Sequence, residues 1–126
     1  MSEDQDVQDY LDTLPDQLKE QLSGVIREQA ELLSEAQKAA LRALEEPPEE
    51  TGHLEASCVV VSGSSDLEVL VQAGGEATTV GNYDHALAFE FGTSHQPARP
   101  FFYPTYNSMK DDMQQAIDDA ASEVLQ

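Results

Sequence analysis

Aromatic residues and prolines are concentrated in one stretch of this chain, Tyr83 to Tyr106, which reads YDHALAFEFGTSHQPARPFFYPTY. It holds all four Phe residues, three of the four Tyr residues and three of the six Pro residues. A proline has no backbone N–H and pushes the residue before it towards extended geometry, so the Pro-rich half cannot lie inside a sheet. Gln96 to Tyr103 is therefore predicted to be an extended arm that lies on a sheet edge or on another surface.

The first half of the stretch predicts a short helix. Asp84 is placed to cap it, and Gly92 stands where a helix needs a terminating residue of positive φ. Glu90 lies between two phenylalanines, where an unpaired buried carboxylate is costly, and Arg99 is the nearby fixed cation. Two alternatives stay open: a Glu90–Arg99 pair, within the chain or across subunits, that pins the arm, or a Glu90 side chain that points outwards.

Three pieces of the chain together carry a family resemblance. They are Thr51 to Ser57 (TGHLEAS), Ala86 to Thr93 (ALAFEFGT) and Pro97 to Pro104 (PARPFFYP), followed by a predicted final helix. In this order they resemble the signature of small tailed-phage (siphovirus-like) morphogenesis proteins: T-G-x-L-x-x-S, then E-F-G-T, then P-A-x-P-F-x-x-P. Those are the head–tail joining, tail-completion and tail-terminator proteins. No single piece is specific, whereas the ordered set is.

The resemblance implies a structural protein of the virion neck rather than an enzyme. Such a protein would be assembled in the host cytoplasm and would terminate or complete the head-proximal end of the tail. Its implied partners are further copies in a ring, expected to be a hexamer, together with the tail tube protein and the head-side connector or stopper. DNA would pass through the channel without specific binding, and no cofactor, metal or membrane is implied. The sequence does not distinguish between a tail terminator, a tail-completion factor and a head-side stopper.

The resemblance also implies which residues would matter. Aromatic and Arg side chains dominate interface energies, so the predicted contact surface is Glu90, Phe91, Arg99, Pro100, Phe101, Phe102 and Tyr103. The predicted structural motif residues are Thr51, Gly52, Leu54, Gly92, Thr93, Pro97 and Pro104. At His85, Phe102 and Tyr103 the family usually has Tyr, Leu and often Arg, and these departures bear on the partner surface that the resemblance implies.

The charge of the chain excludes some functions. Six Lys plus Arg face 25 Asp plus Glu, which gives a formal charge of −19. Phosphate contacts need cations, so direct binding to nucleic acid or to an anionic membrane is not expected. The acidity is compatible with a salt-adapted (halophilic) surface, a solubility device, or the lining of a channel in which DNA must slide. The alternative is an acidic DNA-mimic protein that inhibits a nucleic-acid enzyme.

The rest of the chain predicts one α+β domain over residues 1–126. Residues 1–12 read as an acidic tail, 13–46 as a long amphipathic helix, 51–106 as the sheet, the short helix and the arm, and 104–125 as a C-terminal helix. Leu54 to Ser62 and Leu67 to Ala73 predict a hairpin, and Glu76 to Val80 a third strand or an extended loop. The expected sheet is antiparallel, with about three to four strands.

Catalytic and metal-binding patterns are weak in this sequence. His53, His85 and His95 form no HxH or HxxxH pair, and the lone Cys58 lies in an apolar run that predicts a buried thiol. Carboxylate pairs arise by chance in so acidic a chain. The N-terminus has no basic or apolar leader segment, and no apolar run approaches 20 residues, so a soluble protein is expected.

Overall fold

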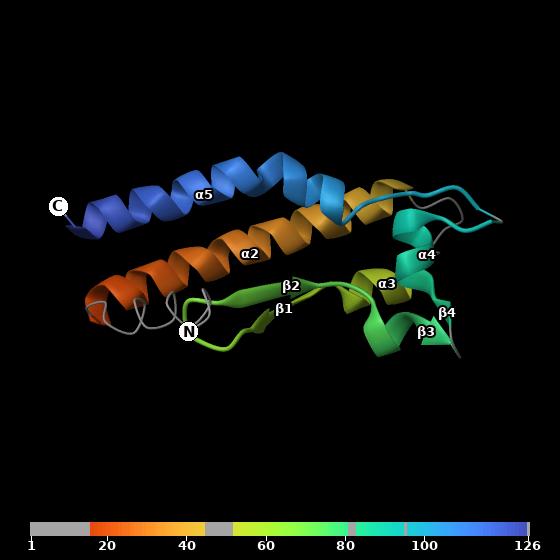
Figure 1. The fold of residues 1–126 in the computed structure, drawn as a ribbon, viewed down its shortest axis with the longest axis horizontal. Helices are drawn as coiled ribbons and strands as arrows, with labels where there is room; N and C mark the ends of the chain where they lie inside the picture. The colour runs from red at the N-terminus through yellow and green to blue at the C-terminus, as the bar shows by residue number, and fades with distance from the viewer. Residues whose placement is uncertain (1–15, 45–51, 81–82, 95, 126) are drawn as a thin grey trace, which may run out of the picture.

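The computed structural model describes residues 16–44, 52–80, 83–94 and 96–125. Helices dominate, and two short antiparallel strand pairs accompany them (Figure 1). The elements in chain order are α2 (Asp16–Leu44), α3 (Gly52–Ser57), β1 (Val59–Ser62), β2 (Val69–Gln72), the 3-10 turn η1 (Gly75–Thr78), β3 (Thr79–Val80), β4 (Tyr83–Asp84), α4 (His85–Phe91) and α5 (Tyr103–Leu125).

Helix α2 is the central rod of the molecule. Its 29 residues span about 43 Å at 1.5 Å per residue. Helix α5 runs antiparallel along one side of it, and the β1–β2 hairpin lies along the other side (Figure 1). The predicted amphipathic stripe is confirmed, with Leu18, Leu33 and Leu41 buried. The predicted helix ends, at residues 13 and 46, lie outside the described residues.

The strands differ from the single sheet expected from the sequence. Strands β1 and β2 pair in antiparallel register, from Val59 opposite Gln72 to Ser62 opposite Val69. Strands β3 and β4, two residues each, pair only with one another in the described part of the chain. Gly74 and Gly75 both have positive φ and turn the chain into η1, so β3 does not extend the β1–β2 hairpin. The prediction of one sheet of three to four strands was therefore wrong.

The chain from Leu54 to Ser57, predicted to begin the first strand, is helical and belongs to α3. His, Leu, Glu and Ala have no β-branched side chain, and the β-branched run starts only at Val59. The hydroxyl of Ser57 donates to the carbonyl of Leu54 at 2.6 Å, a local bond within the helical turn.

The hydrophobic core lies at the C-terminal end of α2. It joins residues of α2, α3, α4 and the predicted arm, namely Leu41, Leu54, Cys58, Ala86, Phe89 and Phe101. Phe89 and Phe101 meet edge to face with ring centroids 5.9 Å apart. The Tyr83–Tyr106 stretch is thus anchored on the core, and this fixes the position of the surface described next.

Candidate assembly surface

Glu90 is buried at the junction of α4 and α5, and its side chain is only 6% exposed. One carboxylate oxygen accepts the backbone N–H groups of Phe101 and Phe102, both at 2.9 Å. The other accepts the N–H of Tyr103 at 3.2 Å. These donors lie at the start of α5, where N–H groups have no partner within the helix and the helix dipole favours an anion. Glu90 therefore caps α5 from a different helix.

The local sequence brings these groups together by reversing the chain after α4. Asp84 caps the start of α4 by accepting the N–H of Ala86 at 2.9 Å. At the other end Gly92 has φ 79°, and its N–H donates to the carbonyl of Ala88. The N–H of Arg99 then donates to the carbonyl of Phe89 at 2.7 Å, so the returning chain lies along α4. The predicted helix, its cap and its terminating glycine are confirmed.

Arg99 makes other contacts than the predicted pair with Glu90. Its guanidinium lies 4.1 Å from the ring centroid of Phe89 and donates to the carbonyl of Leu44 at 3.1 Å. The three N–H donors, not an ion pair with Arg99, account for the burial of Glu90. The outward-pointing alternative and the pair within the chain are therefore both wrong, whereas a pair across subunits stays a prediction. Arg99 fastens the arm to the end of α2 and to α4.

An apolar ridge of exposed side chains borders a small hollow of about 100 Å³, which the buried Glu90 also lines. We define the ridge as Leu87, Phe91 and Tyr103, which are 58%, 63% and 53% exposed. Leu87 and Phe91 are one helical turn apart on α4 and so share one face. The rings of Phe91 and Tyr103 have centroids 6.1 Å apart. Contiguous exposed side chains of this size are typical of contact sites.

The predicted interface residues separate into exposed and buried ones. Phe91, Pro100 and Tyr103 are exposed, whereas Phe102 and Arg99 are half-buried. Phe101 is 1% exposed and belongs to the core, so it is not available as a contact residue. The sequence-based prediction did not include Leu87 among the contact residues. Its spacing of four from Phe91 indicates that the two side chains lie on the same face of the helix.

The predicted structural motif residues have mostly local roles. Gly52 opens α3, Leu54 is buried in the core, and Pro104 lies in the first turn of α5. The N–H of Thr93 donates to the carbonyl of Gln96 at 2.9 Å, which closes the turn after Gly92. Pro97 lies in the exposed arm, and Thr51 lies outside the described residues.

A trough adjoins the ridge, with α2 as its floor and α5 and β2 as its walls. Its volume is about 450 Å³, and Tyr103 belongs to both surfaces. The trough is lined by Ile26, Gln29, Ala30, Leu33, Gln37, Val69, Val71, Phe102, Tyr103, Tyr106, Lys110, Met113, Gln114 and Ile117. At its floor Gln37 donates to the carbonyl of Phe102 at 2.9 Å. Its Oε1 is buried, and no donor for it occurs among the described residues.

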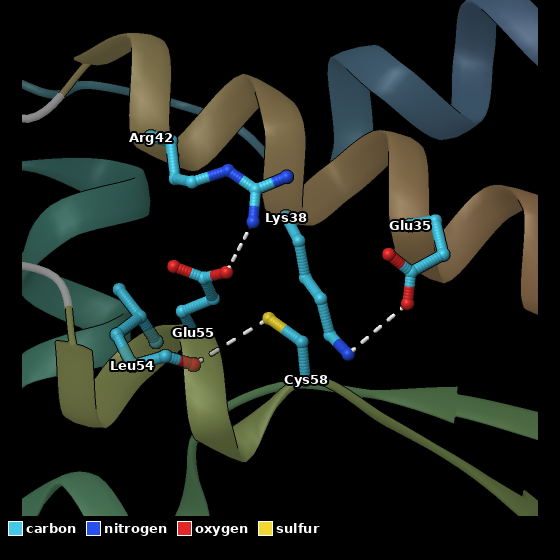
Figure 2. Close-up of polar contacts among 6 residues, drawn as sticks. All are labelled: Glu35, Lys38, Arg42, Leu54, Glu55 and Cys58. Carbon is cyan, nitrogen blue, oxygen red and sulfur yellow. Dashed lines mark hydrogen bonds and ion pairs between the residues drawn. The ribbon is translucent and has the colours of Figure 1, made fainter.

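Cys58 does not have the surroundings of a reactive thiol. It is buried, and its Sγ donates to the carbonyl of Leu54 at 3.5 Å beneath the ion pair between Arg42 and Glu55 (Figure 2). Burial raises the pKa of the Cys58 thiol, and the positive charge of Lys38 offsets this only in part. A reactive cysteine needs a lowered pKa, so the buried, inert thiol predicted from the sequence is what the structure contains.

No family model, curated protein or solved structure matches this chain. Within the described ranges, no three His, Cys, Asp or Glu side chains are grouped so as to hold a metal ion. None of the described helices combines the length and the apolar character that crossing a membrane requires.

Proposed function

We propose that this protein is a structural subunit of the head–tail junction of a tailed virus, where it completes or terminates the head-proximal end of the tail. The observation that carries the proposal is the exposed ridge of Leu87, Phe91 and Tyr103, which lies within the motif-bearing stretch. The partners would be further copies of the chain in a ring, the tail tube protein and the head-side connector or stopper. No catalytic step is part of the proposal.

The proposal is supported by the way the fold holds the contact surface in one position. Glu90 ties α5 to α4, and Arg99 ties the arm to α2 and α4, so the ridge is held without help from a partner. A preorganised apolar surface loses little entropy on docking. The acidity suits the lining of a DNA channel, because carboxylates repel the phosphate backbone and leave DNA mobile.

The test is binding to isolated tail tubes that lack their terminal protein. Wild-type protein should cap the tube end at a fixed stoichiometry, measured by light scattering and by electron microscopy of the tube ends. Phe91→Glu should abolish capping. Leu32→Glu is the matched control, because Leu32 lies on α2 away from the ridge and is 51% exposed. Equal capping by both variants, or none by the wild type, would reject the proposal.

A DNA-mimic function has one observation in its favour. Glu28, Glu31 and Glu35 are exposed and recur at spacings of three and four on α2, which forms a row of carboxylates on one side of the helix. Such a row is what a basic nucleic-acid-binding enzyme would recognise. Replacing all three by Gln should then abolish binding to that enzyme, whereas Phe91→Glu should have no effect. The reverse pattern would favour the head–tail proposal.

A further inference from the structure

Strand β2 has one edge that no other strand covers in the described part of the chain. The N–H of Gly63 donates to the carbonyl of Glu68 at 2.8 Å, so these two residues form a hydrogen-bonded pair of the antiparallel ladder. Hydrogen-bonded and non-hydrogen-bonded pairs alternate along such a ladder. The backbone of Leu70 therefore bonds to β1, whereas the N–H and C=O groups of Val69 and Val71 point away from β1.

This open edge faces the trough. Val69 and Val71 of β2 line the trough, and none of the listed wall residues comes from β1, so β1 lies on the far side of β2. Helix α2 forms the floor and α5 the opposite wall (Figure 1). A strand edge presents unpaired N–H and C=O groups and is a template for pairing with another extended chain. The backbone groups of β2 and the apolar trough thus make one surface.

We propose that this surface is a strand-addition site for a basic partner protein. An extended segment of the partner pairs with the open edge of β2. Its apolar side chains, at every second position, enter the trough, and its cationic side chains point outwards. Main-chain hydrogen bonds supply the affinity in this mode of recognition, and the pockets for alternate side chains supply the specificity. The inference goes beyond the proposed function and does not depend on it.

The backbone of β2 selects an extended occupant over a helical one. A helix uses its N–H and C=O groups internally, so it has none to pair with a strand edge. The outward groups of Val69 and Val71 are two residues apart, about 6.6 Å along a strand, which is the interval at which an added strand presents its own groups. The α2 floor from Ile26 to Gln37 is about 16 Å long, enough for about five residues of extended chain.

The side chains around the edge select an alternating pattern. Val69 and Val71 are half-buried on the face of β2 that lines the trough, whereas Leu70 between them is 42% exposed on the other face. Side chains of an added strand alternate in the same way. Those on the trough side would meet Ala30 and Leu33 of α2, which are apolar and buried. Every second side chain of the partner segment is therefore apolar.

Charge selects a basic segment. The formal charge of −19 attracts cations, and Asp66 and Glu68 beside β2 are exposed. Among the described residues that line the trough, Lys110 is the one with a charge, and it is exposed, so its ammonium group remains in water. Repulsion from a second copy opposes self-pairing here. Residues 1–15 of the chain hold five acidic residues and no basic one, so they do not match the site either.

Peptide binding tests the backbone pairing. The probe is a fluorophore-labelled peptide of alternating Lys and Val, KVKVKVK, titrated with the full chain at about 0.15 M NaCl and measured by anisotropy. The matched control carries N-methyl groups on the central valine and on the lysine that follows it, which keeps every charge and side chain. It should bind about tenfold more weakly or worse, because backbone donors are lost. Equal affinities would show attraction by charge alone and would overturn the proposal.

Hydrogen exchange measured by NMR locates the contact. In the free protein the amides of Val69 and Val71 should exchange faster than that of Leu70. The peptide should slow exchange at Val69 and Val71 by about tenfold or more and leave Leu70 unchanged. Protection of Val69 and Val71 in the free protein would overturn the proposal. Protection that depends on protein concentration would assign the edge to a second copy, and protection that does not would assign it to the chain itself.

Two variants block the site from opposite walls. Val71→Pro removes an outward N–H and no bond to β1, the kind of edge position that tolerates proline. Met113→Lys leaves β2 intact and places a cation in the α5 wall. Each should weaken peptide binding about tenfold or more, whereas Gln115→Lys, exposed on α5 outside the trough lining, should change it less than about threefold. Unchanged binding to Met113→Lys would overturn the proposal, even if Val71→Pro did not fold.

Discussion

The Glu90 carboxylate holds the start of α5 through hydrogen bonds from three successive backbone N–H groups. Hydrogen bonds to a charged acceptor contribute about 1.5–3 kcal/mol in proteins, and an anion at a helix N-terminus gains from the dipole as well. The same three bonds fix Tyr103 relative to Phe91. One buried side chain thus contributes both to the stability of the fold and to the geometry of the ridge.

We expect Glu90→Gln to lower the free energy of unfolding by about 1–3 kcal/mol, because the amide NH₂ replaces one of the two accepting oxygens and faces an N–H donor. Urea denaturation followed by circular dichroism measures this. Glu123→Gln, an exposed position on α5, is the control and should change stability by less than about 0.5 kcal/mol. Equal unfolding midpoints for the two variants would show that Glu90 is not a cap.

Asp84 gives a pH-dependent prediction at the start of α4. A hydrogen bond from the Thr78 hydroxyl, together with backbone N–H donors that include Ala86, lowers the pKa of the Asp84 carboxyl below its ordinary value. Because the pKa of Asp84 is lower in the folded chain, the unfolded chain binds more protons at pH values around and between the folded and unfolded pKa values. The ionised Asp84 carboxylate therefore stabilises the fold fully above the unfolded pKa of about 3.9. This stabilisation is lost as the pH falls through the folded-state pKa.

We accordingly expect Asp84→Ala to destabilise the protein by about 1 kcal/mol at neutral pH, the usual cost of losing an N-cap. The difference from wild type should shrink at about pH 3, which lies below the unfolded pKa of about 3.9, because the unfolded wild-type chain takes up a proton there. Urea midpoints at both pH values measure it, with exposed Asp112→Ala as the control. A difference that is the same at both pH values would contradict the charged cap.

At this scale the sequence indicated which residues were unusual, but not their partners. Glu90 stood out because it lies between two phenylalanines, and Asp84 and Gly92 were correctly predicted to bound α4. The partners of Glu90 lie 11 to 13 residues further along the chain and are backbone groups, which carry no sequence signal. Phe101 looked like a contact residue because nothing local distinguishes it from Tyr103.

At the scale of the element, two glycines give opposite predictions for the same substitution. Gly92 has φ 79°, and a Cβ there would lie 2.7 Å from the backbone N of Ala98. Gly24 lies inside α2 with nothing within 4 Å of its Cβ position. We expect Gly92→Ala to cost about 1–3 kcal/mol through backbone strain. Gly24→Ala should stabilise the chain by about 0.5–1 kcal/mol through helix propensity.

Thermal melts of the two variants beside wild type measure this, and the sign of each shift decides the outcome. A Gly92→Ala protein that melts at or above the wild-type temperature would mean that the chain reversal after α4 is not tightly constrained. The ridge would then not be rigidly presented. A Gly24→Ala protein that melts lower would place a contact at that face of α2.

Elements with strong periodicity were predictable, and short ones were not. The apolar stripe of α2 and the alternation of Val69 and Val71 in β2 were both found where expected. Strand pairing failed because Gly74 and Gly75 redirect the chain into η1, and pairing between distant strands depends on that direction. The six-residue helix α3 is too short to carry a helical period, so the sequence pattern predicts a strand from Leu54 onwards.

At the scale of the whole molecule, α5, α2 and the hairpin lie side by side, and the apolar core is confined to one end of α2 (Figure 1). A chain organised in this way leaves an apolar trough and an apolar ridge exposed together. The sequence could not predict the trough, because its lining comes from three elements that are distant in the chain.

Salt dependence follows from the charge of the whole molecule. With a formal charge of −19, carboxylates repel one another in the folded chain and across any contact between two copies. Raising NaCl from about 0.01 M to about 1 M shortens the screening length from about 30 Å to about 3 Å. We expect the melting temperature and the self-association constant to rise together. Binding to a basic partner would instead weaken with salt.

The matched variant for this prediction replaces Glu28, Glu31 and Glu35 with Gln, which reduces the formal charge from −19 to −16. It should melt higher than wild type at low salt and should gain less from added NaCl. Ordinary screening is largely complete near 0.15 M, where the Debye length is about 8 Å. Stability that levels off there indicates an acidic surface that serves solubility or a channel lining, whereas stability that keeps rising beyond about 1 M indicates adaptation to a saline host. A melting temperature that does not respond to salt would contradict a destabilising role for the acidic surface.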